Sequence, residues 1–305
     1  MTMFPRVVER IAELREMLDA ERANGRRVGF VPTMGSLHAG HASLMHRARA
    51  ENDVVLVSIF VNPLQFGPKE DFAAYPRDLD RDLEVCAGEG VDIVFHPDVD
   101  EMYPEPNRVT VAVGEIGSIL EGRTRPGHFD GVATVVSKLF NIAGPCRAYF
   151  GQKDAQQLVV IERLALALDF PVEVVGCPTV REPDGLAMSS RNVYLEGADR
   201  RAAAALKAAL DSGALLIADG ERSGAKVREV MAARIDAEPR ATLDYAVCVD
   251  PEDLVEAAEV DGPVLLAVAA RVGKARLIDN MNVSPAPSRG ARTGTSRSEA
   301  SITKG

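Results

Sequence analysis

The fold is decided by the stretch Val28-Gly-Phe-Val-Pro-Thr-Met-Gly-Ser-Leu-His-Ala-Gly-His41, which leads from an apolar run into a helical segment through a turn with glycines. Residues 28–31 predict a β-strand, and residues 40–51 predict the helix that follows it. The next apolar run, residues 54–61, is rich in Val and Ile and contains one polar residue, Ser58. Such a run is typical of a parallel strand that is buried on both faces. This region therefore predicts a strand–helix–strand unit.

The same alternation continues through the first two thirds of the chain. Further strands are predicted at residues 91–95, 148–151 and 172–176, and further helices at 78–89, 132–143 and 154–169. Strands that take turns with helices indicate βαβ units and a parallel sheet. Because such crossovers are right-handed, we expect an α/β fold with a Rossmann-like, doubly wound parallel sheet over residues 1–179.

The pattern changes after residue 178, where a turn-rich stretch covers residues 181–186. Helices are predicted at 200–219 and 224–237, and strands at 242–249, 264–272 and 275–279. In the first of these strands, Leu243, Tyr245, Val247 and Val249 should share one face. We therefore expect a smaller C-terminal α+β domain over residues 180–284. Residues 285–305 are rich in Pro, Ser, Gly, Thr and Arg and predict a disordered tail.

Composition excludes several classes of protein. The 305 residues carry a net charge of −10, which disfavours nucleic acid as a partner because phosphate binding needs clustered basic residues. The longest apolar run is far below the roughly 20 residues of a membrane helix, so no membrane partner is expected. The N-terminus lacks the layout of a signal peptide, which favours the cytoplasm. The cysteines at 86, 146, 177 and 248 form no CxxC motif, so we expect buried reduced thiols and no metal ligands.

Two segments predict a phosphate site. His38 and His41 follow a strand at the start of a helix, where the helix N-terminus and the flanking Gly35 and Gly40 favour a bound anion. A histidine that only caps the helix is the alternative reading. Met188-Ser-Ser-Arg191 is a second candidate, because two hydroxyls and a guanidinium can bind phosphate oxygens. By itself this second segment is equally compatible with an ordinary surface loop.

The chain resembles the pantothenate synthetase (pantoate–β-alanine ligase) family of the HIGH-motif nucleotidyltransferase superfamily. The resemblance runs from about residue 4 to 284 and rests on five segments in order. These are residues 32–41 (PTMGSLHAGH), 58–67 (SIFVNPLQFG), 75–77 (YPR), 150–157 (FGQKDAQQ) and 184–192 (DGLAMSSRN).

This resemblance implies the ATP-dependent ligation of pantoate and β-alanine through a pantoyl adenylate, with Mg²⁺ accompanying ATP. It implies an ATP- and pantoate-binding first domain, a C-terminal lid domain and a homodimer. Pantoate would contact Gln65 and Gln157, and catalysis would depend on His38, His41, Lys153 and Arg191. The ATP site would comprise Met34, Gly35, Ser36, Leu37, His38, Ala39, Gly40, His41, Gly151, Gln152, Lys153, Asp154, Val180, Met188, Ser189, Ser190 and Arg191.

Some alternatives stay open at this stage. Asp154 could cap the following helix instead of contacting a ligand. The alternating acids Asp78, Asp80, Asp82 and Glu84 are interpreted as a solvated helix face. A nucleotidyltransferase for another acceptor, such as phosphopantetheine, is disfavoured by the two glutamines on the pantoate side. A non-catalytic nucleotide- or RNA-binding module is disfavoured by two observations. The polar residues His38, His41, Lys153 and Arg191 are all present, and the net charge of the chain is negative.

Overall fold

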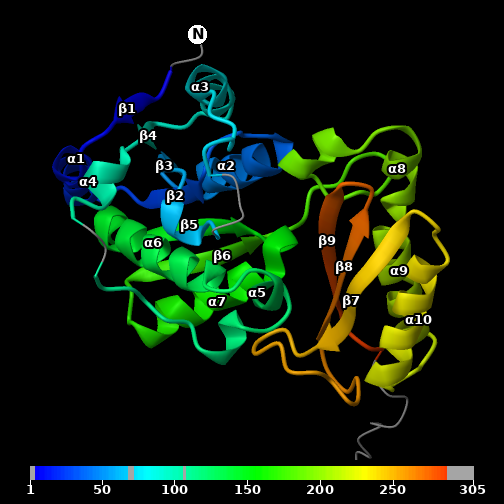
Figure 1. Cartoon of the computed structure of the whole chain (residues 1–305). Coiled ribbons are helices and arrows are strands. Elements are labelled where there is room, and N and C mark those ends of the chain that lie inside the picture. Colours follow the sequence, from blue (N-terminus) through cyan, green and yellow to red (C-terminus); the bar gives the residue numbers. More distant parts are fainter. Residues whose placement is uncertain (1–3, 68–71, 106–107, 287–305) are drawn as a thin grey trace, which may run out of the picture.

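The computed structural model describes residues 4–67, 72–105 and 108–286, and at Arg191 the backbone alone. These residues form a larger unit around a six-stranded sheet and a smaller unit around a three-stranded sheet, which lie side by side (Figure 1). The predicted tail lies outside the described residues from 287 onward. The division of the chain into domains at residues 179 and 180 stays a prediction.

All strands of the larger sheet run parallel, in the order β1-β4-β3-β2-β5-β6. Their bounds are Arg6–Val8 (β1), Val28–Thr33 (β2), Val54–Ile59 (β3), Ile93–Phe95 (β4), Cys146–Gly151 (β5) and Val172–Cys177 (β6). From β2 the chain builds outward through β3 and β4, and it then returns to the other side of β2 for β5 and β6. The predicted Rossmann-like class is confirmed. The strand order reverses between β2 and β5, which is where a doubly wound sheet opens a crevice for ligands.

Helices cover both faces of this sheet. The helices on one face are α1 (Ile11–Ala23), α6 (His128–Ala143) and α7 (Ala155–Ala167), and those on the other are α2 (Ala39–Glu51) and α3 (Leu79–Gly88). Side chains alternate along the strands, so Phe30 and Leu56 pack toward α6 while Val31 and Val57 pack toward α2. Strand β1 and helix α1 were not predicted from the sequence.

The smaller unit places two helices on one face of an antiparallel sheet. Its elements are α9 (Ala204–Ala218), α10 (Gly224–Asp236), β7 (Ala241–Val249), β8 (Val264–Val272) and β9 (Ala275–Val283). The helix predicted at 200–219 is divided at Ala203 into α8 (Gly197–Ala202) and α9. The remaining short elements are α4 (Val99–Met102), α5 (Glu121–Thr124) and the 3₁₀ turns η1 (Pro63–Gln65), η2 (Glu115–Gly117), η3 (Gln152–Asp154) and η4 (Ser190–Tyr194).

One prediction about β7 is wrong. The pairing of β7 with β8 shifts register between Leu243 and Tyr245, which marks a β-bulge. An inserted residue reverses the faces, so Leu243 packs in the core under α9 and α10 while Tyr245 and Val247 pack on the opposite face. The four apolar residues of this strand therefore do not share one face.

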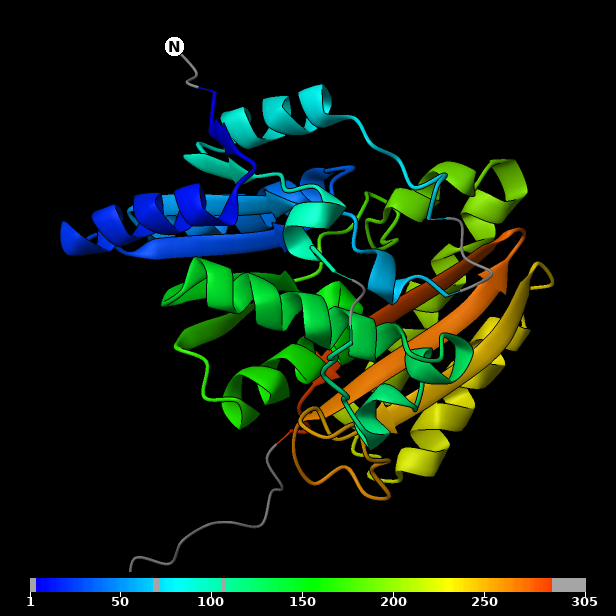
Figure 2. The same cartoon turned by 60° about the vertical axis from the view of Figure 1, so that its left-hand side comes forward.

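The second face of the small sheet packs against the larger unit (Figure 2). Val159 of α7 lies in one apolar cluster with Val247 and Leu265. Beside this cluster, both terminal nitrogens of Arg276 contact the carboxylate of Glu121, at 2.7 and 2.8 Å. No helix among residues 4–67, 72–105 and 108–286 combines the length and the apolar character that a bilayer crossing requires.

Candidate functional site

A cavity of about 490 Å³ opens where the strand order reverses, at the carboxyl ends of β2 and β5. Because these ends meet at one edge of the sheet, segments far apart in the sequence share its wall. The predicted residues on the wall are Met34, His38, Gly40, His41, Gln65, Gly151, Lys153, Asp154, Gln157, Val180, Met188, Ser189 and Ser190. The structure thus brings the His38–His41 turn and the Met188–Ser190 segment to one cavity.

The two histidines form a capping box at the start of α2. Nδ1 of His38 accepts the backbone N–H of Gly40 at 3.1 Å, and Nδ1 of His41 accepts the backbone N–H of His38 at 3.3 Å. An imidazole nitrogen that accepts a hydrogen bond carries no proton, so in the neutral rings the proton is on Nε2. Capping and ligand binding are therefore compatible, because capping leaves an Nε2–H donor on each ring.

Burial keeps these rings neutral. It lowers the pKa of His41 to about 3, with a smaller contribution from the neighbouring His38. Burial also lowers the pKa of His38, and the ammonium of Lys153 adds to the effect. The ring centroids are 4.1 Å apart, so two imidazolium charges would repel each other strongly. Near neutral pH, the pair therefore offers hydrogen-bond donors, and the positive charge on the wall of this cavity comes from Lys153 and Arg125.

Asp82 holds the turn that precedes the histidines. Its carboxylate accepts the backbone N–H groups of Ser36 and Leu37, at 2.9 and 2.7 Å, and the residue is 2% exposed. Ser36 and Gly35 both have positive φ, of 53° and 79°, so the chain bends sharply around the carboxylate. The interpretation of the acids of α3 as a solvated face is therefore wrong for Asp82. Its spacing from Leu79 and Cys86 on the buried face of the helix could have revealed this.

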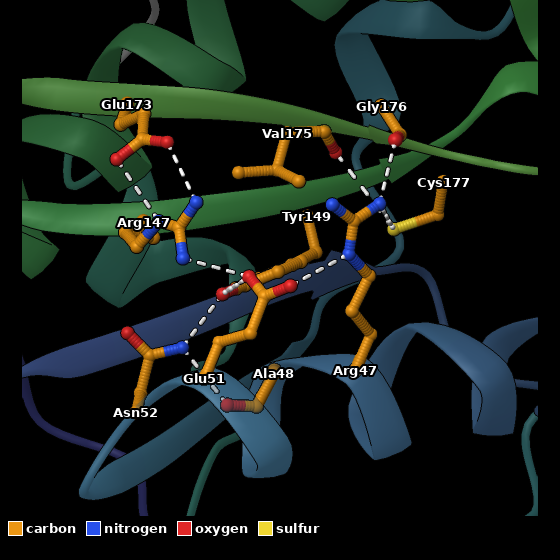
Figure 3. Close-up of polar contacts among 10 residues, drawn as sticks. All are labelled: Arg47, Ala48, Glu51, Asn52, Arg147, Tyr149, Glu173, Val175, Gly176 and Cys177. Atoms are coloured by element: carbon orange, nitrogen blue, oxygen red, sulfur yellow. Dashed lines mark hydrogen bonds and ion pairs between the residues drawn. The ribbon is translucent and has the colours of Figure 1, made fainter.

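A polar network fastens α2 to the sheet (Figure 3). Glu51, at the end of α2, accepts hydrogen bonds from Arg147 at 2.7 Å, from Tyr149 at 2.9 Å and from Arg47 at 3.0 Å. Arg47 also donates to the backbone carbonyl of Gly176 on β6, at 3.0 Å. The helix that begins at the paired histidines is thus tied at its far end to both β5 and β6.

Lys153 and Asp154 follow β5 in the turn η3. The Lys153 ammonium lies 3.3 Å from the Asp154 carboxylate, and the lysine side chain is 18% exposed. Asp154 is the N-cap residue that directly precedes α7, but its side chain makes no capping hydrogen bond. The capping alternative for Asp154 is therefore wrong. Among the described residues, Asp154 is the only carboxylate on the wall of this cavity.

The glutamine at the other side of the cavity is held in a buried turn. Asn62 donates to Oε1 of Gln65 at 3.2 Å and to the carbonyl of Gly131 at 3.1 Å. Gln65 in turn donates to the sulfur of Met34 at 2.8 Å. Gly131 is required here, because a Cβ at this position would lie 2.2 Å from the carbonyl oxygen of Leu64.

Two adjacent glutamines of α7 have different environments. The buried Gln156 accepts the N–H of Glu121 at 2.9 Å and donates to the carbonyls of Ile116 and Ile119, so it fastens a loop. Gln157 is partly exposed and lines the cavity. Gln157, which the sequence predicts to bind pantoate, is therefore the one of the two that lines this cavity.

The Met188–Ser190 segment is fastened to the chain that leaves β6. The N–H of Met188 donates to the carbonyl of Val180 at 2.9 Å, and Arg181 pairs with Ala187 as an isolated β-bridge. The backbone of Arg191 lies in η4, but its side chain falls outside the described part of the structure.

Five residues predicted at the nucleotide site are not among those that line this cavity: Gly35, Ser36, Leu37, Ala39 and Gln152. Leu37 packs in the core between α2 and the sheet. Gly35 and Ser36 form the bend around Asp82. Gly35, Ser36 and Leu37 therefore shape the turn that precedes the two histidines.

A second cavity, of about 780 Å³, lies between the small sheet and the segments α5, α6, η3 and α7 of the larger unit. Lys153, Asp154, Gln157 and Ser189 line both cavities. The wall of the second cavity also includes Arg276 and other residues of the small sheet. A ligand at the carboxyl ends of β2 and β5 would therefore have space beside it that reaches the smaller unit.

The comparisons with known proteins agree with this geometry. The family model described as pantoate-beta-alanine ligase matches residues 6–282. The pantothenate synthetase of Geobacillus kaustophilus is 53% identical over 91% of this chain and 92% of its own length. That of a Roseiflexus species is 57% identical over 90% of this chain and 98% of its own length.

Solved structures give the same result. A crystal structure of pantothenate synthetase from Thermus thermophilus superposes with a TM-score of 0.86 at 49% identity, over 92% of this chain and 100% of its own. The structure of the Francisella tularensis ligase, complexed with β-γ ATP and β-alanine, superposes with a TM-score of 0.74 at 35% identity. The match covers 91% of this chain and 97% of the Francisella chain. The chain belongs to the pantoate–β-alanine ligase family.

Proposed function

We propose that this protein joins pantoate and β-alanine with the energy of ATP, through a pantoyl adenylate. The observation that carries the proposal is the shared cavity, in which Nε2–H donors, a lysine and two glutamines surround one space. The complex of the Francisella ligase with β-γ ATP and β-alanine supports the same chemistry. The roles below rest on that geometry and on the sequence resemblance.

In the first step, a carboxylate oxygen of pantoate attacks the α-phosphorus of ATP, and the bond from this phosphorus to the bridging oxygen breaks. Pyrophosphate leaves. Lys153 and the Nε2–H groups of His38 and His41 stabilise the negative charge on the phosphate oxygens. No protein nucleophile is required, and the residues act by positioning the reactants. Because His41 is buried and neutral, we assign it a hydrogen-bonding role.

Pantoate would lie between the amides of Gln65 and Gln157, which can bind both its hydroxyls and its carboxylate. The nucleotide would lie along Gly151, Lys153 and the Met188–Arg191 segment, with the backbone of Val180 beside adenine. Asp154, a carboxylate on this wall, would face the ribose or the bound cation. Gly35, Ser36, Leu37, Ala39 and Gln152 would form the backbone frame of the nucleotide site.

In the second step, the β-alanine amine attacks the activated carbonyl carbon. The acyl carbon–oxygen bond breaks, the amine loses a proton and AMP departs with the oxygen that came from pantoate. The cavity beside the small sheet offers a path for β-alanine to reach the adenylate. The smaller unit, residues 180–284, would act as the lid over this path.

Mg²⁺ is proposed to accompany ATP. The described residues contain no group of three or more acidic, histidine or cysteine side chains that could hold a metal ion by themselves. A single carboxylate at the cavity, that of Asp154, fits an ion that keeps water and phosphate oxygens as its other ligands. When bound, the ion would neutralise phosphate charge.

We further propose a cytoplasmic homodimer. The four cysteines are free, as is typical of proteins in a reducing compartment where ATP is available. Residues 108–113 have no assigned helix or strand, the N–H groups of Val111 and Val113 donate to side chains of α6, and Val109 is 81% exposed. A segment with exposed apolar side chains and unpaired backbone is a surface that a second copy can cover. Sedimentation of the wild type against Val109→Asp tests this proposal: a monomeric wild type would contradict it.

The activity itself is tested by AMP formation. We expect AMP release that requires ATP, pantoate and β-alanine together, and pyrophosphate exchange into ATP with pantoate alone. AMP formation without pantoate, or exchange that needs β-alanine, would contradict the proposed order of steps.

A further inference from the structure

The turn that carries Lys153 is held by a side chain of the smaller unit. Asn280, on β9, donates one amide hydrogen to the carbonyl of Gln152 at 2.9 Å and the other to the carbonyl of Lys153 at 2.8 Å. Asn280 is 7% exposed. Both donors of one buried amide are therefore used on two consecutive carbonyls of η3, which fixes the turn relative to the small sheet.

Asn280 is itself held in place. The carboxylate of Asp279, which is 2% exposed, accepts the backbone N–H of Asn280 at 2.8 Å. Arg181 contacts this carboxylate with two nitrogens, at 2.6 and 3.0 Å, and also reaches the carbonyl of Asn280 at 3.3 Å. Such a two-point contact between guanidinium and carboxylate is geometrically specific.

The same network joins three parts of the proposed nucleotide site. Arg181 directly follows Val180 and pairs with Ala187, so it also supports the loop that ends in Met188. The turn η3, which carries Lys153, has no side-chain cap at its own N-terminus. The amide of Asn280 is thus a link between the smaller unit and the backbone of Lys153.

We propose that Asn280 is a positioning residue for Lys153, and that the small sheet sets the place of the lysine ammonium at the phosphates. This inference rests on the proposed function, in which Lys153 binds phosphate. Without the two hydrogen bonds, η3 would have more freedom and the lysine would spend less time in its productive position. A displacement of about an ångström at a phosphate contact can lower a rate by about a hundredfold.

The test replaces Asn280 by Asp, which is similar in shape but lacks the amide donors and adds a negative charge, and by Ala, which removes the donors without adding a charge. The matched controls are Asn282→Asp and Asn282→Ala, at an exposed position two residues further along β9. We expect kcat/KM for ATP to fall about 10- to 100-fold in both Asn280 variants. The KM for pantoate should stay close to that of the controls. The melting temperatures of the Asn280 variants should fall by a few degrees, because two carbonyls lose their donors, so the rates are compared well below the melting temperature of every variant.

A double-mutant cycle separates positioning from a general structural role. If Asn280 acts through the lysine, Asn280→Ala should lower activity by less than about twofold in a Lys153→Ala background. Losses that multiply would overturn the proposal, and so would Asn280 variants that match their controls. If Lys153→Ala kept full activity, the role of the lysine in the proposed function would fail first, and this inference would fail with it.

Discussion

Replacing Asp82 by Asn tests whether the backbone turn before the histidines depends on one buried carboxylate. The change keeps the shape of the side chain but removes its charge and one acceptor oxygen. In the wild type, the two oxygens accept the N–H groups of Ser36 and Leu37 at 2.9 and 2.7 Å. In the variant, one N–H can still find the amide oxygen, and the other faces an NH₂ group.

The magnitude follows from these two bonds. Hydrogen bonds to a charged group contribute about 1.5–3 kcal/mol each, against about 1 kcal/mol for neutral pairs, and an unpaired buried donor costs about 1–3 kcal/mol. We therefore expect the free energy of unfolding to fall by about 2–3 kcal/mol. For a chain of 305 residues, this corresponds to a decrease in melting temperature of about 3–5 °C. The distorted turn should also lower kcat/KM for ATP at least about tenfold.

Thermal unfolding and AMP-formation kinetics measure both effects. The matched control is Asp80→Asn, the same substitution at an exposed position of the same helix. The control should keep its activity and melt close to the wild type. If Asp82→Asn behaved like the control in both assays, the carboxylate would not hold the turn and the reasoning would be refuted.

Three further outcomes are expected. Gly131→Ala should raise the KM for pantoate and lower stability, because its Cβ would lie 2.2 Å from the carbonyl oxygen of Leu64; steady-state kinetics with wild-type values would contradict this. Gln157→Ala should raise the KM for pantoate about tenfold while Tm stays unchanged, and an unchanged KM would remove the residue from the pantoate site. Because the pKa of His41 falls to about 3 from about 6.5 in the unfolded chain, protonation favours the unfolded state as pH falls below 6.5. Urea titrations should therefore show a loss of about 2 kcal/mol between pH 8 and pH 5 that His41→Gln lacks, and an equal loss in both proteins would show that His41 is not held neutral.

The alternation of strands and helices could be predicted from the sequence because burial on both faces leaves long apolar runs, as in β3 (Val54–Ile59). Strand β1 was missed because a three-residue edge strand is too short to show a period. The bulge in β7 was missed for a different reason. A single inserted residue leaves the alternating pattern in the sequence intact while it reverses which face each side chain occupies.

The cavity residues were accessible to sequence reasoning where they occur in compact segments, such as the turn that contains His38 and His41. Asp82 was misread because a buried carboxylate looks like its exposed neighbours until its backbone partners are known. Asn280 could not be predicted, since its partners Gln152 and Lys153 are more than 120 residues away in the chain. Sequence reasoning thus identified residues that line the cavity more readily than residues such as Asp82 and Asn280, which hold the backbone of the segments that form it.

The central claim is that the pantoate carboxylate attacks the α-phosphorus of ATP, and an isotope measurement tests it most directly. Pantoate labelled with ¹⁸O in its carboxylate is turned over with ATP and β-alanine, and the products are analysed by mass spectrometry. The account predicts one ¹⁸O atom in each AMP and none in pyrophosphate. Unlabelled AMP, or label in pyrophosphate or inorganic phosphate, would contradict it.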